Sequence, residues 1–154
     1  MRDLSAIDIS DFLPHRPPFL LVDKVLELDD TSVSTSLKIK RNCLFVKNNK
    51  FDEVGLVEFA AQTCSAIVGK DYFDEDDIKG KGNKLIGFIS SVKKLTIFDC
   101  PSLDSTIIAK AKLISSYDNG SFNLSTLSCR IYEESKELLS CELNLIIQEA
   151  NQIQ

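Results

Sequence analysis

The stretch from Asp52 to Gly69, DEVGLVEFAAQTCSAIVG, predicts one long helix and decides the fold. Apolar residues lie almost all the way round this helix, and a helix without a broad polar face normally runs through a protein interior. One narrow polar line remains, because Glu58, Gln62 and Ser65 stack along one edge at i, i+4 and i+7. A carboxyl group on an interior helix is costly unless it is paired or hydrogen-bonded. The position of Glu58 therefore needs an explanation.

The length and composition favour one globular domain. A chain of 154 residues suits a single domain, residues 1–154, around one core. Its hydrophobic content of 44% and charged content of 27% argue against disorder. The formal charge of −5 disfavours a nucleic-acid partner, since binding phosphates requires a basic face. No apolar run is long enough to cross a membrane, and the acidic N-terminus MRDLSAIDISDF is unlike a signal peptide. We expect a cytoplasmic protein that does not bind membranes.

The cysteines and acidic residues do not form a recognisable metal or disulfide pattern. The five cysteines are widely spaced and include no CxxC pair, so we expect free thiols in a reducing compartment. The most polar segment, Asp71 to Asn83, contains the run DEDD. A solvated loop is the better interpretation of that run, with metal binding as the alternative. We expect neither a metal nor a cofactor.

The residues before the helix predict a short helix and a β-hairpin. Ser5 to Leu13 predicts a short helix that ends at Pro14. Leu20 to Leu28 predicts a strand rich in apolar residues, and Ser32 to Lys40 alternates apolar and polar residues without a break. The pair Asp29-Asp30 between them is typical of a turn, so the two strands should form a hairpin.

Arg41 to Phe51 is expected to be a loop that leads into the long helix, with Asp52 as its N-cap. After the polar segment, turn residues such as Asp118-Asn119-Gly120 separate four more apolar runs. These runs predict four strands, Leu85 to Ile97, Ser105 to Ser115, Phe122 to Tyr132 and Leu139 to Ile147. An antiparallel sheet must cover one of its faces, and the long helix is the large apolar element available. The chain therefore predicts an α+β fold in which the sheet wraps the helix.

This order of elements is similar to the hotdog arrangement, and two motifs make the likeness more specific. The segment Leu13 to Asp23, LPHRPPFLLVD, closely resembles the LPHRxPFLLVD opening of the FabZ-type 3-hydroxyacyl-acyl-carrier-protein dehydratases. The segment Glu58 to Gln62, EFAAQ, resembles the ExxAQ of that family's central helix, where the glutamate is catalytic. The likeness covers nearly the whole chain. It implies a cytoplasmic lyase of lipid metabolism, active in fatty-acid or polyene-type synthesis.

One departure from that family concerns the catalytic histidine. In the family a GHFP segment supplies this histidine fourteen residues before the glutamate, and Leu44 stands at that position here. His15, in the opening motif, is the single histidine of the chain. A divergent branch of predicted dehydratases, including those beside aryl-polyene synthesis genes, is more similar, because it keeps HRxP and ExxAQ but lacks GHFP.

The resemblance implies that Glu58 and His15 are the catalytic residues. Dehydration of a 3-hydroxyacyl thioester requires a base for the α-proton and an acid for the leaving hydroxyl. We assign the acid to Glu58 and the base to His15. The alternatives are a structural carboxyl bonded to Gln62, and a histidine that braces the Pro-rich loop.

Four residues are candidates for substrate binding. Gln62 is expected to orient Glu58. The backbone N–H groups near Gly55, at the start of the helix, favour developing negative charge on a thioester carbonyl. Phe19 and Phe88 are expected to line an acyl channel or to belong to the core.

The resemblance also implies the partners. The acyl tunnel of the family lies at a dimer interface, and exposed sheet edges favour such pairing. We expect a homodimer or higher homo-oligomer, or a heterodimer with a homologue, acting on an acyl carrier protein or acyl-CoA thioester. An acidic carrier requires a basic patch, and the candidates are Lys79, Lys81 and Lys84, or Lys93 and Lys94. A non-catalytic partner subunit and a hotdog acyl thioesterase remain the alternative functions.

Overall fold

The computed structural model describes residues 9, 13, 15–69 and 85–149. They form one helix and eight strands. In chain order the elements are β1 Lys24–Leu28, β2 Ser32–Lys38, β3 Val46–Lys47, β4 Lys50–Phe51, α1 Glu53–Gly69, β5 Leu85–Ile97, β6 Thr106–Asp118, β7 Asn123–Glu133 and β8 Lys136–Glu149.

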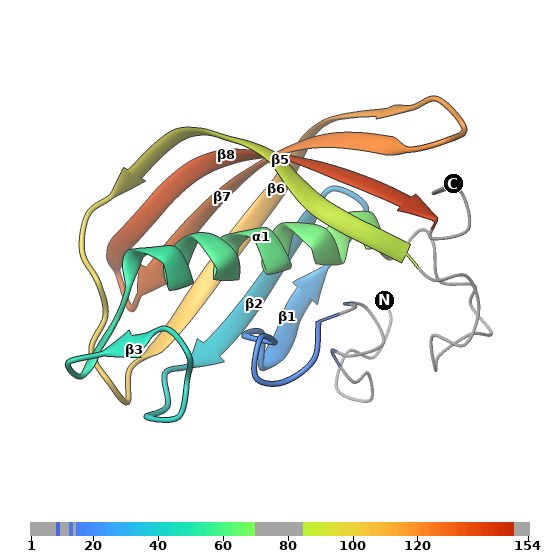
Figure 1. Cartoon of the computed structure of the whole chain (residues 1–154). Coiled ribbons are helices and arrows are strands. Elements are labelled where there is room, and N and C mark those ends of the chain that lie inside the picture. The colour runs from blue at the N-terminus through green and yellow to red at the C-terminus, as the bar shows by residue number, and fades with distance from the viewer. Residues whose placement is uncertain (1–8, 10–12, 14, 70–84, 150–154) are drawn as a thin grey trace.

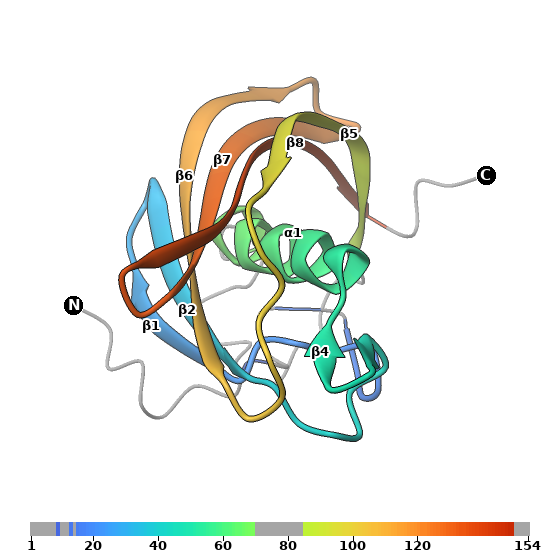
Figure 2. The same cartoon turned by 90° about the vertical axis from the view of Figure 1, so that its left-hand side faces the viewer.

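Six of the strands form one antiparallel sheet in the order β1-β2-β6-β7-β8-β5. The sheet curves round α1, which lies across its concave face (Figures 1 and 2). The two remaining strands, β3 and β4, form a small separate hairpin beside the start of the helix. This arrangement confirms the α+β hotdog fold expected from the sequence.

The core lies between α1 and the inner face of the sheet, and strand β7 illustrates how the alternating pattern builds it. Leu127, Cys129 and Ile131 are buried under the helix, while Ser128 and Arg130 between them face outward. Burying alternate residues fixes the register of a strand, because a shift by one residue would expose the whole apolar set. A polar contact also joins the layers: the Thr35 hydroxyl of β2 lies 2.7 Å from the Thr63 hydroxyl of α1, and both side chains are fully buried.

Two boundaries before the helix differ from the prediction. The first strand begins at Lys24 rather than Leu20, because the backbone groups of Phe19 and Leu21 bond to the Gln62 side chain and strand-like bonding to β2 begins at Asp23. The expected loop from Arg41 to Phe51 contains the β3–β4 hairpin, whose turn residues Asn48 and Asn49 have φ values of 52° and 60°. Two consecutive left-handed residues make the type I′ turn that joins tightly paired strands, and asparagine tolerates this conformation.

Two predicted segments lie largely outside the described residues. The expected short helix over 5–13 and the polar segment over 71–83 lie outside them, apart from residues 9 and 13. In the described part of the chain no helix has the length and apolar character needed to cross a bilayer.

The start of α1 is fixed by a cap and by two aromatic rings. The Asp52 carboxylate accepts a hydrogen bond of 2.7 Å from the Gly55 N–H, which confirms the predicted N-cap. Gly55 is buried against Phe45 and Phe51, whose rings meet edge to face with centroids 6.2 Å apart. A Cβ atom at position 55 would lie 2.6 Å from the Phe45 Cβ atom and 2.7 Å from the Phe51 ring. The absent side chain thus lets the hairpin close against the helix.

We expect Gly55→Ala to lower the free energy of unfolding by about 1–3 kcal/mol, because the added methyl group would overlap the side chains of Phe45 and Phe51. Phe51 belongs to β4, so relieving the overlap would also displace the β3–β4 hairpin. Urea denaturation measures this loss. Gly87→Ala is the matched control: its Cβ would lie at an ordinary 3.6 Å from Ile147, and we expect a change of about 0.5 kcal/mol or less. Equal stability of the two variants would contradict the packing described for Gly55.

Candidate functional site

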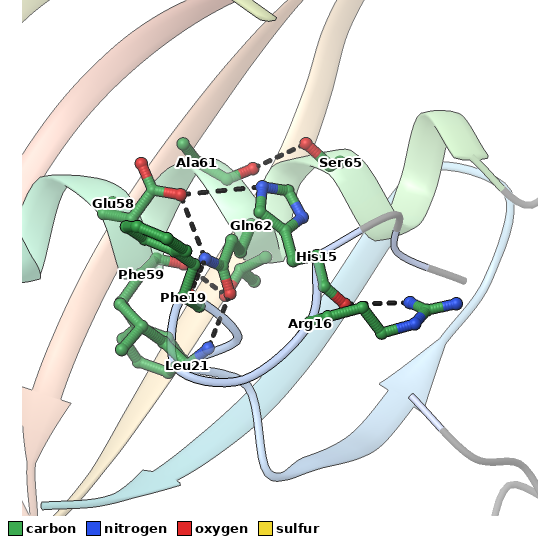
Figure 3. Close-up of polar contacts among 10 residues, drawn as sticks. His15, Arg16, Phe19, Leu21, Glu58, Phe59, Ala61, Gln62 and Ser65 are labelled. Carbon is green, nitrogen blue, oxygen red and sulfur yellow. Dashed lines mark hydrogen bonds and ion pairs between the residues drawn. The ribbon is translucent and has the colours of Figure 1, made fainter. Parts of the chain in front are cut away.

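The site is organised by the side-chain amide of Gln62, which is fully buried in the middle of α1. Its Nε2 group donates to the Glu58 carboxylate at 3.0 Å and to the Phe19 carbonyl at 2.8 Å. Its Oε1 atom accepts from the Leu21 N–H at 2.8 Å. The bonds to Phe19 and Leu21 attach the Pro-rich segment before β1 to one side of the helix (Figure 3), and the third bond lies within the helix. Gln62 and Glu58 are thus hydrogen-bonded, and the expected role of Gln62 in orienting Glu58 toward a substrate stays a prediction.

The attached segment places the imidazole of His15 beside Glu58. The His15 Nε2 atom lies 3.6 Å from the Glu58 Oε1 atom, so the two predicted catalytic side chains meet within one chain. Figure 3 shows the imidazole and the Glu58 carboxylate facing each other on the same side of the helix. The distance is longer than a hydrogen bond, and apo sites commonly have such looser contacts.

Burial and local charge set the protonation of His15. Removal of the imidazole from water lowers its pKa from 6.5, while the Glu58 carboxylate opposes this shift and the Arg16 guanidinium adds to it. The imidazole is therefore neutral at neutral pH, as a general base must be. Its Nδ1 atom is buried and has no hydrogen-bond partner among the described residues.

Arg16 contributes to the shape of the loop through its guanidinium group. Its Nη1 atom donates to the carbonyl oxygens of Leu13 and His15, both at 2.8 Å. Such bonds satisfy backbone acceptors in a segment where prolines supply few donors. Arg16 thus holds the turn that presents the imidazole to the helix.

The exposure of Glu58 differs from the sequence-based interpretation. The helix is not enclosed all the way round, since Val54 is 65% exposed and Glu58 follows it one turn later on the same side. The Glu58 side chain is 31% exposed and that of His15 is 28% exposed. Periodicity alone could not reveal this open side, because Val54, one turn before Glu58, is apolar although it is exposed. The carboxyl group therefore faces space that a ligand can reach.

The other predicted binding residues are less closely tied to this pair. Phe19 lies beside Glu58 with its side chain 60% exposed (Figure 3). Phe88 is 45% exposed on β5, at the opposite edge of the sheet from β1. The Gly55 N–H is already bound to Asp52, and phenylalanine rings fill the space beside its Cα atom. The roles of these three residues toward a substrate stay predictions.

Two backbone groups of the site were not identified from the sequence, namely the Phe19 carbonyl and the Leu21 N–H. Both bind Gln62, so they connect the two motifs LPHRPPFLLVD and EFAAQ. The sequence contained both motifs that this contact joins. It did not indicate that Gln62 would bind the backbone of Phe19 and Leu21. Among the described residues, no group of three or more metal-ligating side chains comes together.

The arrangement is suited to moving protons. A neutral imidazole and a carboxyl group within 3.6 Å of each other, half open to solvent, can act as a base and an acid on one small molecule. Leu44, which stands where a second histidine is expected in FabZ-type proteins, is 51% exposed in the segment before β3. His15 is therefore the one imidazole that this chain can supply.

Comparison with known proteins gives a consistent family. A model of the ApeP-like family, described as ApeP dehydratase, matches residues 7–154. Among curated relatives, the 3-hydroxyacyl-[acyl-carrier-protein] dehydratase FabZ of Methylobacterium sp. (strain 4-46) is 40% identical over 77 residues, 43% of this chain and 46% of that protein. FabZ of Rhizobium johnstonii is 35% identical over 78 residues, 46% of this chain and 49% of that protein. The chain thus spans less than half the length of these relatives.

Solved structures share the fold. A chain of the dehydratase heterocomplex ApeI:P from Xenorhabdus doucetiae superposes with a TM-score of 0.77 at 15% identity, covering 96% of this chain and 95% of that one. A hypothetical thioesterase from Streptococcus pneumoniae TIGR4 has a TM-score of 0.57 at 11% identity, covering 82% of this chain and 85% of that one. At such identities the likeness concerns the fold.

Replacing Gln62 by leucine tests the connection between loop and helix. We expect Gln62→Leu to lower the free energy of unfolding by about 1–3 kcal/mol, because the buried Leu21 N–H loses its acceptor. Urea denaturation at neutral pH is the measurement. Ser65→Ala, one turn further along the helix, removes only a bond to the Ala61 carbonyl and should change stability by about 0.5 kcal/mol or less. Two variants of equal stability would show that the two bonds from Gln62 to Phe19 and Leu21 do not hold the loop.

Proposed function

The chain belongs to the ApeP-like dehydratase family, and on this premise we propose that it is a 3-hydroxyacyl thioester dehydratase, a hydro-lyase that converts its substrate to a 2-enoyl thioester and water. The observation that carries the proposal is the approach of the His15 imidazole to the Glu58 carboxyl, 3.6 Å apart on the open side of α1. The curated relatives named FabZ support the same reaction.

The reaction breaks a C–H bond and a C–O bond on neighbouring carbons. The proton on the α-carbon is acidified by the thioester carbonyl, and the hydroxyl on the β-carbon leaves only if it is protonated. His15, neutral because burial lowers its pKa, accepts the α-proton. The step requires Glu58 to start as the neutral carboxylic acid. It gives that proton to the β-hydroxyl, which departs as water while the C=C bond forms.

The closeness of the two side chains also explains how the enzyme returns to its starting state. After one turnover His15 carries the proton taken from the α-carbon, and Glu58 lacks the proton given to the leaving water. A proton can pass back from Nε2 to Oε1, since these atoms are 3.6 Å apart and a small movement brings them into hydrogen-bond range. Gln62 holds Oε1 from the other side at 3.0 Å and so keeps the carboxyl in this position.

The substrate would be carried as a thioester of an acyl carrier protein or of CoA. Names of the relatives support the carrier protein. The lysines considered for docking are placed differently: Lys79, Lys81 and Lys84 lie outside the described residues, while Lys94 on β5 forms an ion pair of 3.0 Å with Glu142. Lys93, its neighbour on β5, is exposed and remains the better candidate.

We further propose that β5 pairs with a second hotdog chain, either another copy or a homologue. Strand β5 is an edge of the sheet, and unpaired edges with apolar side chains favour association. Its exposed apolar residues are Ile86, Phe88, Ile89, Val92 and Leu95. A second chain on this edge would cover these side chains and could place Phe88 against an acyl chain.

A second candidate function is that of a partner subunit in a dehydratase heterodimer. Leu44 in place of a histidine favours it, as does the name of the similar heterocomplex from Xenorhabdus doucetiae. In this case the homologous chain would supply a further imidazole.

We expect Glu58→Gln and His15→Asn each to lower kcat/KM about 10²–10⁴-fold, because each removes one proton-transfer group. The measurement follows the absorbance of the 2-enoyl thioester formed from a 3-hydroxyacyl carrier protein. Glu53→Gln, in the first turn of the same helix, is the matched control and should retain activity.

Unchanged turnover in Glu58→Gln would remove this residue from the mechanism. Release of free thiol without formation of the enoyl product would indicate a thioesterase. Turnover that requires addition of a homologous dehydratase would favour the partner-subunit function.

Association through β5 is tested by Val92→Asp, which places a charge among the exposed apolar side chains of this strand. We expect this variant to elute as single chains in size-exclusion chromatography with light scattering, whereas the wild type elutes as a dimer or larger assembly. Ile114→Asp on β6, where the native side chain is 54% exposed, should leave the assembly intact. Dissociation by Ile114→Asp alone would place the interface elsewhere.

A further inference from the structure

The outer face of the sheet, turned away from α1, carries a hollow of about 340 Å³ across β2, β6 and β7. We call it the outer-face groove and define it by Ser32, Ser34, Lys110, Lys112, Ser128 and Arg130, which line it. None of these residues takes part in the His15–Glu58 site, which lies on the other side of the sheet (Figures 1 and 3).

Strand register places the cations of the groove side by side. Lys110 of β6 pairs directly with Arg130 of β7 and, on its other side, with Ser34 of β2. Lys112 lies two residues further along β6 on the same face, between Ser32 and Ser128. Like charges directly opposite each other destabilise a sheet, and the chain as a whole is acidic, with a formal charge of −5. A cluster of three cations flanked by hydroxyls is therefore not explained by the net charge of the chain, which is negative.

Nearby acids neutralise this cluster only in part. Glu27 lines one end of the groove, and the Glu137 carboxylate lies 3.7 Å from the Arg130 Nε atom. That contact uses one of the five N–H groups of a guanidinium. The Lys110 ammonium lies 5.9 Å from the centre of the Tyr132 ring, which orients it toward the groove wall. Among the residues that line the groove, three cations therefore face one carboxylate, while the carboxylates of Glu137 and Asp29 contact Arg130 and Ser32 from outside the lining.

We propose that the outer-face groove binds a phosphoryl group. Phosphate oxygens match what the groove offers: two ammonium groups, a planar guanidinium that can bind two oxygens at once, and the hydroxyls of Ser34 and Ser128. The Ser32 hydroxyl already donates to the Asp29 carboxylate at 2.6 Å. The small serine side chains leave the room that the ligand occupies. The phosphoryl group comes either from free phosphate or from a phosphate monoester such as a nucleotide. Binding there does not depend on the dehydratase activity.

This site is tested by titrating the whole chain with inorganic phosphate and recording two-dimensional amide NMR spectra at each step. We expect saturable shifts at residues 32–34, 110–112 and 128–130 that sodium chloride of equal ionic strength does not reproduce. The same titration with adenosine 5′-monophosphate distinguishes the sources: tighter binding than phosphate indicates a nucleotide, and equal binding indicates the phosphoryl group alone.

Three variants make the test specific. Lys110→Ala and Arg130→Gln should each raise the Kd for phosphate about tenfold, as expected for loss of one charge-assisted contact. Lys47→Ala removes an exposed lysine from β3 outside the groove and should leave the Kd unchanged. Shifts that chloride reproduces, or equal Kd values in all three variants, would overturn the proposal and leave a solvated basic face.

Discussion

The hydrogen bonds of one buried amide hold the candidate site together. Gln62 binds the Glu58 carboxylate with its amino group and the Leu21 N–H with its carbonyl, and the same amino group reaches the Phe19 carbonyl. Leaving a buried amide without hydrogen-bond partners costs free energy of folding, so the Pro-rich segment must keep its position on the helix. The distance between His15 and Glu58 therefore follows from an interaction in which neither imidazole nor substrate takes part.

The sequence predicted the main elements because each has a strong local signal. The apolar run over 52–69, its aspartate cap and the Asp118-Asn119-Gly120 turn all rest on short-range physics. The β3–β4 hairpin was missed although Asn48-Asn49 carries its turn signal, since two-residue strands have too little alternation to recognise. The start of β1 was placed early, because Leu20 to Asp23 has strand-like composition but bonds partly to a side chain.

The candidate site was predicted in part. Sequence motifs identify its residues, but they do not determine how exposed those side chains are in the folded chain. The two motifs identified His15, Glu58 and Gln62 as a group, and the structure places all three in contact. Their exposure could not be derived in the same way. Whether an apolar helix is enclosed depends on how far a sheet curls, and this depends on the twist of six strands rather than on the helix sequence. The half-open position of Glu58 is thus a tertiary property.

The strand order has a consequence for how the chain acquires its structure during synthesis. Strand β5 is the first to follow the helix, yet its one neighbour in the sheet is β8, the last strand made. As the ribosome releases the chain, β1 and β2 can pair at once, while β5 must wait for some forty further residues before it finds its position. During that interval the backbone of β5 has no partner strand, and unpaired strand edges are prone to aggregation. The six-stranded sheet is complete only when β8 has been made and joins β7 to β5.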